Sequence, residues 1–206
     1  ILPDEFQVDD WLAIVRLKRG YAKSLACSTV IKLATRKTET CSIKKEQWPT
    51  RNEIDISKSR GRKLISITIT ENIKYYRPRT IDFDINFAAL VRRWIDTHWD
   101  RLSRLYFLRT GKMPEELFLS DAVGYEGTPI SPATIYNCFK IKHDWGLTTW
   151  YPHFARHYSI CKDLHDNLQM DAAAAGRPIN AMPSDWVFSR IRFWLDFQRK
   201  RAGHNS

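Results

Sequence analysis

The stretch Trp150-Tyr151-Pro152-His153-Phe154-Ala155-Arg156-His157-Tyr158 places two imidazoles and one guanidinium within five residues. Pro152 suits the first turn of a helix, where a missing backbone N–H costs nothing. On such a helix His153, Arg156 and His157 stand at positions i, i+3 and i+4, so they share one face. A cationic face of this kind on a basic chain indicates an anionic substrate, and a phosphodiester is the first candidate.

The composition also favours an anionic partner. The chain has 206 residues, a length that suits one substantial domain or two small ones, and a formal net charge of +10. Hydrophobic residues make up 43% and aromatic residues 13%, which supplies a core and argues against disorder. The positive charge is spread along the whole chain and favours nucleic acid over an acidic membrane surface. No apolar run approaches the roughly 18 residues of a membrane span.

The four cysteines show no CxxC spacing, which argues against a zinc ribbon or finger. All but Cys41 lie in apolar periodic runs, so we expect core thiols in a reducing, intracellular compartment such as a bacterial cytoplasm or a host nucleus. His153, His157 and Cys161 have a spacing that suits metal ligands, but no further ligand set is clear and Arg156 would repel a cation. We therefore expect no metal and no cofactor. A histidine pair without function is the competing interpretation.

Apolar residues at a spacing of three to four predict most of the chain to be helical. Ser131-Pro132 and Ser184-Asp185 supply helix-start signals. Residues 166–183 carry a run of alanines with Gly176 and two prolines, which predicts a loop or an insertion. The expected helices cover residues 4–19, 22–34, 36–48, 85–109, 131–139, 150–164 and 184–197.

Between residues 53 and 83 the apolar period changes to two, which is typical of strands. Ile54 and Ile56 alternate with polar residues, a basic turn follows at 58–63, and a clear alternating strand follows that turn. Residues 73–83 predict a third strand, which Pro78 makes an edge strand or a bulged one. The sequence therefore predicts an α+β fold: a mostly helical domain with a small three-stranded antiparallel sheet.

Several further signals are weak one at a time but come in a distinctive order. Arg36-x-x-Glu39 follows two apolar helices, and it alone is most often a solvated helix pair. Lys74 follows the second turn of the predicted sheet, and Arg79 comes five residues later. The His153-x-x-Arg156 motif and a terminal Ala202-Gly203-His204-Asn205-Ser206 then complete the series.

In this order the motifs resemble the catalytic domain of the tyrosine recombinases, the phage integrase family, over nearly the whole chain. Arg36 and Glu39 match the family's first arginine and the glutamate that follows it. Lys74 matches the β-hairpin lysine, and His153 and Arg156 match its His-x-x-Arg motif. His157 stands where the family often has His or Tyr, and residues 202–206 match a Leu-Gly-His-Ser-Ser-like motif with His204 as its histidine.

The resemblance implies metal-free transesterification. A tyrosine would attack the scissile phosphate to give a 3′-phosphotyrosyl intermediate, which a DNA 5′-hydroxyl would reverse. Arg36 and Arg156 would bind the non-bridging oxygens. Lys74 would protonate the 5′-oxygen, while His153 and His204 would assist at the phosphate. Glu39 and His157 would support these residues.

The expected DNA contacts are basic side chains in and after the predicted sheet. The run 58–63 is most often a solvated turn, and in a chain of this charge it could equally bind phosphates. Affinity should then depend strongly on salt. The candidate DNA-binding residues are Lys58, Arg60, Arg62, Lys63, Arg77 and Arg79.

Three departures from the family pattern stand out. The usual Thr-Gly-Leu-Arg is Leu33-Ala34-Thr35-Arg36 here. Arg156 and His204 are 48 residues apart in the sequence, about twice the usual separation in the family. Residues 166–185 are therefore expected to be an insertion. The family's tyrosine lies a short distance beyond the histidine of the last motif, whereas all tyrosines of this sequence precede His204.

We therefore expect residues 1–206 to be a single catalytic domain of a site-specific DNA recombinase or integrase, as found in mobile elements. It would be an inactive fragment without the family's N-terminal core-binding domain and C-terminal tyrosine segment. Its partner would be double-stranded DNA, with self-association into a synaptic tetramer at full length and no membrane contact. Two alternatives stay open: a type IB topoisomerase or telomere resolvase, and a DNA-binding module of this fold without catalysis.

Overall fold

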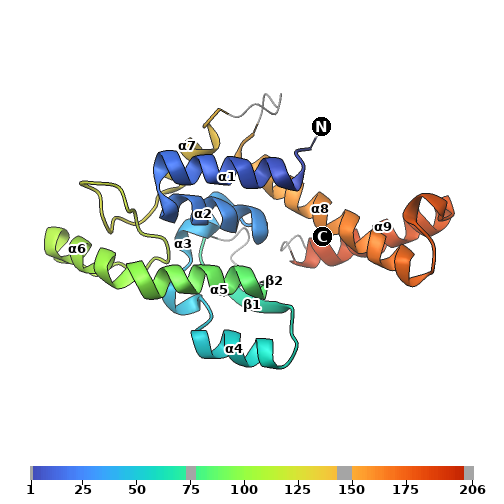
Figure 1. Ribbon diagram of the computed structural model, residues 1–206, viewed down its shortest axis with the longest axis horizontal. Coiled ribbons are helices and arrows are strands. Elements are labelled where there is room, and N and C mark those ends of the chain that lie inside the picture. The colour runs from blue at the N-terminus through green and yellow to red at the C-terminus, as the bar shows by residue number, and fades with distance from the viewer. Residues whose placement is uncertain (1, 73–77, 143–149, 202–206) are drawn as a thin grey trace.

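The computed structural model describes residues 2–72, 78–142 and 150–201. These residues form a mostly helical body with one small antiparallel sheet, and a helical hairpin projects from one side of the body (Figure 1). Lys74, Arg77 and His204, all named above as site residues, lie outside the described residues.

The N-terminal helices α1 (Glu5–Arg19) and α2 (Tyr21–Lys32) confirm the first two predicted helices. Asp4 caps α1 by accepting a hydrogen bond from the backbone N–H of Gln7, 2.8 Å away. Gly20 connects the two helices at a φ of 98°, and a Cβ atom there would collide with the Asp121 carboxylate. Most of α2 is buried, and it contacts α1, α7 and α8, so it is the central helix of the fold.

The predicted helix at 36–48 is two shorter pieces, α3 (Lys37–Ser42) and the 3-10 helix η1 (Lys45–Gln47). Ile43 and Lys44 between them are extended. The Leu117 N–H donates to the Ile43 carbonyl at 2.8 Å, and Lys44 forms a β-bridge with Glu116. This pairing with a distant segment satisfies the backbone groups that a continuous helix would have used.

The prediction of a first strand at Ile54 and Ile56 is wrong, because residues 51–59 form helix α4 (Arg51–Ser59). Thr50 and Glu53 make a capping box, in which each side chain bonds the other residue's backbone N–H. An alternation of two isoleucines over three positions fits a helix as well as a strand, and in the helix Ile54 is buried while Ile56 is exposed. The expected three-stranded sheet is therefore incorrect.

The described part of the chain holds one two-stranded antiparallel sheet, β1 (Leu64–Ile69) and β2 (Arg79–Asp84). Leu64 pairs with Asp84 at one end, and Ile69 pairs with Arg79 at the other. Ile67, Ile69, Ile81 and Phe83 point into the core, which confirms the predicted period of two for these strands.

The predicted long helix at 85–109 is confirmed, with one local difference. It consists of α5 (Ile85–Trp94), a π-helical stretch η3 (Ile95–Trp99) and α6 (Asp100–Thr110), which run on without a break in Figure 1. Gly111 ends it in the left-handed conformation. The capped helix α7 (Pro132–Phe139) is also confirmed.

The helix predicted from residue 150 is longer than expected, since α8 (Pro152–Ala174) continues into the segment expected to be a loop. A 3-10 turn η4 (Ile179–Ala181) leads to α9 (Ser184–Arg201), which packs against α8. The far end of this helical hairpin projects from the body in Figure 1.

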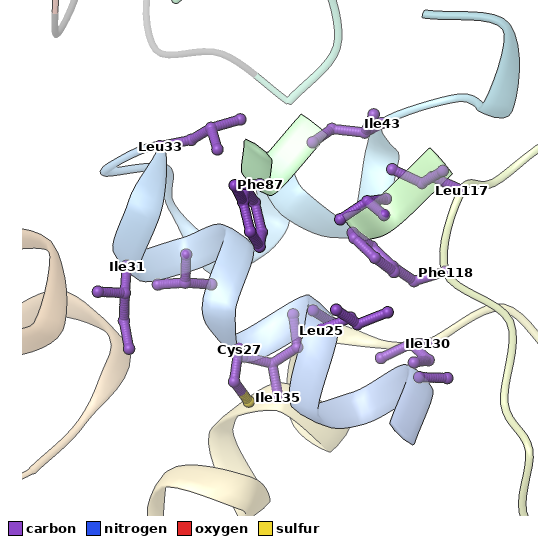
Figure 2. Close-up of a cluster of buried hydrophobic side chains, with 14 of the residues drawn as sticks. Leu25, Cys27, Ile31, Leu33, Ile43, Phe87, Leu117, Phe118, Ile130 and Ile135 are labelled. Atoms are coloured by element: carbon purple, nitrogen blue, oxygen red, sulfur yellow. The ribbon is translucent and has the colours of Figure 1, made fainter. Parts of the chain in front are cut away.

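The core lies between α2 and the segments that cover it. Figure 2 shows a cluster in which side chains of α2 meet Phe87 of α5, Ile135 of α7 and the segment 117–118. A second group of aromatic rings joins Trp11 of α1 to Phe139 and Trp150. Cys161 is exposed, so its predicted place in the core is wrong, whereas Cys27 and Cys138 are buried as predicted.

Candidate functional site

The centre of the site is the carboxylate of Glu39, which is completely buried. Arg36 Nη1 lies 2.6 Å from Glu39 Oε1, and Arg79 Nη2 lies 2.6 Å from Glu39 Oε2. Arg156 Nη1 lies 3.6 Å from the same Oε2 atom. One carboxylate therefore holds three guanidiniums together and leaves a surplus of positive charge around it.

These side chains come from three elements far apart in the sequence. Arg36 is the N-cap of α3, and its backbone N–H donates to Glu39 Oε2 at 2.7 Å. Arg79 begins β2, and Arg156 lies near the start of α8. The Ser159 hydroxyl donates a hydrogen bond to the Ile31 carbonyl, which fixes α8 against α2. The packing of α8 and β2 around α3 thus assembles the cluster.

The surplus of positive charge contributes to a lowered pKa of the buried Arg156. The pKa of Arg156 is lowered to about 10, by burial first and then by the charges of Arg79 and Arg36, while the charge of Glu39 opposes the shift. A group whose charged form is disfavoured in this way gains from any anion that approaches it. The cluster is therefore suited to binding an anion such as a phosphate group.

A pocket of about 260 Å³ opens beside the cluster. It lies at the N-terminus of α8, where Tyr151 makes no side-chain capping hydrogen bond. A helix N-terminus presents backbone N–H groups and a positive dipole end, which also favours an anion. The pocket is lined by Thr35, Arg36, Lys37, Thr38, Tyr136, Tyr151, Pro152, His153 and Arg156.

The two histidines of residues 150–158 face each other on the first turns of α8. His153 Nε2 and His157 Nε2 lie 2.9 Å apart, and the ring planes are nearly perpendicular. The pKa of His153 is lowered by burial first, and then by His157, Arg156 and Arg36. His153 is therefore neutral near pH 7, where one ring nitrogen can donate and the other can accept a hydrogen bond.

The structure places three of the five expected catalytic residues, Arg36, His153 and Arg156, on one pocket. The supporting residues Glu39 and His157 lie in contact with them. The two remaining catalytic residues, Lys74 and His204, lie outside the described residues.

Arg79 differs from the expectation that it would contact DNA from the sheet. Only 8% of its side chain is exposed, because its guanidinium is committed to Glu39. An arginine at the first position of a strand can point to either face, and the buried carboxylate decides which. Arg79 therefore belongs to the interior of the site.

The basic turn between α4 and β1 is a separate cluster. Lys58, Arg60, Arg62 and Lys63 are all exposed. The turn adjoins the Leu64 end of the sheet, whereas Arg79 lies at the Ile69 end. Five strand steps at about 3.4 Å each separate these ends by roughly 17 Å.

Among the lining residues that the sequence reasoning missed, three have charged or aromatic side chains. Lys37 follows Arg36 directly, and Tyr151 lies two residues before His153, so these neighbours could have indicated both lining residues. Tyr136 is carried to the pocket by α7, and no motif in the sequence marks it. Two tyrosines therefore share a pocket with the cationic groups.

Among the described residues, no group of three or more His, Cys, Asp or Glu side chains is arranged to hold a metal ion. The helices of that same part of the chain include none with the length and apolarity to cross a membrane.

No family model matches the chain, and no curated protein matches it. Among solved structures, the fold is similar to that of the XerH site-specific recombinase bound to its palindromic difH substrate in a post-cleavage complex. The TM-score is 0.51 at 11% sequence identity, and the similarity covers 98% of this chain and 52% of the XerH chain. The chain thus spans about half the length of that recombinase, and its helical architecture with a small antiparallel sheet is similar in fold to a site-specific recombinase.

Proposed function

We propose that this chain is the catalytic domain of a DNA-breaking and rejoining enzyme of the tyrosine recombinase kind. The observation that carries the proposal is the pocket where Arg36, His153 and Arg156 meet beside the buried Glu39. The fold similarity to a site-specific recombinase supports the same conclusion independently of these residues.

In the proposed reaction the two guanidiniums of Arg36 and Arg156 bind the non-bridging oxygens of one DNA phosphate. Their charge stabilises the extra negative charge of the pentavalent transition state, a role in which preorganised donors are most effective. Glu39 holds the guanidiniums in place before the substrate arrives. Neutral His153 donates a hydrogen bond to the same phosphate or transfers a proton there.

The covalent step follows the chemistry that the resemblance implies. A tyrosine hydroxyl gives its proton to neutral His153 as its oxygen bonds to phosphorus, and the bond from phosphorus to the 5′-oxygen breaks. Lys74 supplies the proton that the leaving 5′-oxygen needs, and His204 hydrogen-bonds the phosphate. Attack by a 5′-hydroxyl on the 3′-phosphotyrosyl bond reverses the step and rejoins a strand.

Binding to duplex DNA would extend beyond the pocket. The exposed basic turn with Lys58, Arg60, Arg62 and Lys63 is suited to phosphate contacts that carry no sequence information. Recombination between two sites would bring several copies together on DNA, in a synaptic tetramer. The process would belong to DNA integration or excision by a mobile element, inside a cell.

A nicked suicide duplex tests the reaction directly. The protein with all of its native sequence should form a covalent 3′-phosphotyrosyl adduct without added metal. Arg36→Ala should slow adduct formation by about 100- to 1000-fold, the loss seen when one preorganised charge-stabilising donor is removed. Arg104→Ala, which removes an exposed arginine of α6, is the matched control and should react at the normal rate.

The outcomes separate the alternatives. DNA binding without any adduct would favour a non-catalytic module of this fold. Relaxation of supercoils without strand exchange would favour a type IB topoisomerase. An adduct that depends on a divalent metal would contradict the proposed guanidinium mechanism.

The role of Lys74 has a separate test. Lys74→Ala should slow cleavage of normal DNA, and a bridging 5′-sulfur should restore much of the rate because a thiolate leaves without a proton. Equal rescue of Arg36→Ala and Lys74→Ala by sulfur would contradict this role.

A further inference from the structure

We propose that the pocket beside the guanidinium cluster holds one unpaired nucleoside of a DNA strand, packed against Tyr136 and Tyr151. This inference rests on the proposed function, because it places the attached phosphate on Arg36 and Arg156. It adds a substrate preference: the strand at this site is out of the base stack.

The pocket has two chemically different walls. Arg36 and Arg156 form a cationic wall, Tyr136 and Tyr151 form an aromatic one, and neutral His153 adds a hydrogen-bonding group. A nucleotide has the same division into a charged phosphate and an apolar, planar base. Proteins that bind single strands combine these two features, with positive charge along the backbone and aromatic rings for the bases.

Both tyrosines are accessible yet held in place. Tyr136 is 39% exposed and Tyr151 is 40% exposed. Tyr136 lies on α7 between Ile135 and Cys138, which are both buried. Tyr151 follows the buried Trp150, and its ring lies 6.0 Å from the ring of Phe154. Rings anchored in this way need little further ordering when a base packs against them.

Two lysines add positive charge to the aromatic wall. Lys37 Nζ lies 4.9 Å and Lys140 Nζ lies 4.7 Å from the centroid of the Tyr136 ring. A cation–π contact at an exposed site is worth less than the stacking of a base on an aromatic side chain. A base can therefore displace a lysine from the ring, and the freed ammonium group can contact a neighbouring phosphate.

The size of the pocket limits what it can hold. Its volume of about 260 Å³ is close to the lower end of the small-molecule sites in proteins, which run from about 300 Å³. Such a space suits one nucleoside and excludes a base pair. The nucleotide must therefore leave its duplex, which is easiest at a nick, a mismatch or a melted step.

Two short single strands with the same number of phosphates test the inference. One is an oligothymidylate and the other is an abasic strand of equal length, so they differ only in their bases. Fluorescence anisotropy measures the dissociation constant of each. The chain should bind the thymidylate at least about fivefold more tightly, the lower end of the stacking contribution of one base.

Substitutions in the pocket test whether the pocket causes the ratio between the affinities for the two strands. Tyr136→Ala with Tyr151→Ala should bring the ratio to about one and leave the affinity for the abasic strand unchanged. Phe at both positions should preserve the ratio, because stacking uses the ring rather than the hydroxyl. Tyr125→Ala is the matched control, since Tyr125 is exposed and does not line the pocket. Equal binding of the two strands by the unaltered chain, or a ratio that survives the double alanine variant, would overturn the inference.

The same assay separates failure of this inference from failure of the proposed function. Arg36→Ala should weaken binding of both strands by the same factor and keep their ratio. If that variant binds both strands normally, Arg36 does not bind a phosphate, even when the tyrosine substitutions change the ratio. If it lowers the affinity for both strands while the tyrosine substitutions have no effect, phosphate binding by Arg36 is supported and nucleoside binding by the pocket is contradicted.

Discussion

A single residue, Glu39, determines the geometry of the site. Its buried carboxylate contacts guanidiniums of α3, β2 and α8, so it connects elements that share no sequence neighbourhood. A buried charge is tolerated when it is paired and hydrogen-bonded, and removing one partner leaves the others uncompensated. Glu39 is therefore the residue on which the positions of all three arginines depend.

Glu39→Gln should lower the free energy of unfolding by about 3–5 kcal/mol, the cost of leaving buried charges without their partner. Urea denaturation followed by circular dichroism measures the change. Glu46→Gln removes the charge of an exposed glutamate and is the matched control. Equal stability of Glu39→Gln and Glu46→Gln would show that the cluster does not depend on this carboxylate.

His153 should make DNA binding depend on pH. Its pKa is lowered by burial and by His157, Arg156 and Arg36, so the ring is uncharged at neutral pH and gains a proton only in acid. An anion on the pocket favours the protonated ring, so affinity should rise as pH falls below about 6.5. His153→Gln should remove this rise, as measured by titration at constant ionic strength.

The same titration of His165→Gln, which changes an exposed histidine further along α8, should keep the rise. A pH profile that is identical for the chain and for His153→Gln would contradict the placement of His153 against the phosphate.

The sequence predicted part of this site for a clear reason. Positions i and i+3 on a helix fix a shared face, so His153 and Arg156 could be paired from spacing alone. The inward turn of Arg79 could not be predicted, because it depends on a carboxylate forty residues away in the chain. The place of Tyr136 depends on how α7 packs, and no local pattern encodes that.

At the scale of elements, Asp171 joins α8 to α9. Arg190 Nε and Trp194 Nε1 each donate a hydrogen bond of 2.7 Å to Asp171 Oδ2. Exposed phenylalanines at positions 188, 193 and 197 show that much of the apolar surface of α9 is not packed against the body. These polar contacts are therefore a large part of what holds α9 on α8.

Asp171→Ala should loosen α9 without unfolding the body. Hydrogen bonds that involve charged groups contribute about 1.5–3 kcal/mol, so amides of α9 should lose protection of that order in hydrogen exchange. Amides of α5 are the internal control and should keep their protection. Unchanged exchange in α9, or the same loss in α5, would contradict a local role for Asp171.

Elements with strong end signals were predicted well from the sequence. Ser131 and Pro152 mark helix starts that the structure confirms. The alternation at Ile54 and Ile56 was too short to distinguish a strand from a helix, and the capping box at Thr50 decided for the helix. Residues 172–175 are alanines, the best helix formers, and they extend α8 even though Gly176 and Pro178 suggested a loop.

At the scale of the whole molecule, the net charge of +10 favours an anionic partner, as the proposed function requires. The fold is similar to that of a site-specific recombinase. The order of motifs along the chain predicted this fold where composition alone could not. The number of strands was wrong because it depended on the weakest of the periodic segments.

We propose that the pocket of Arg36, His153 and Arg156 binds a DNA phosphate, and the salt dependence of duplex binding measures that contact. Arg36→Ala should weaken binding and reduce the slope of log K against log salt by about 0.9, the loss of one phosphate contact. Arg104→Ala removes the same charge from an exposed position on α6 and should keep the slope. Identical affinity and slope for Arg36→Ala and the unaltered chain would contradict the claim.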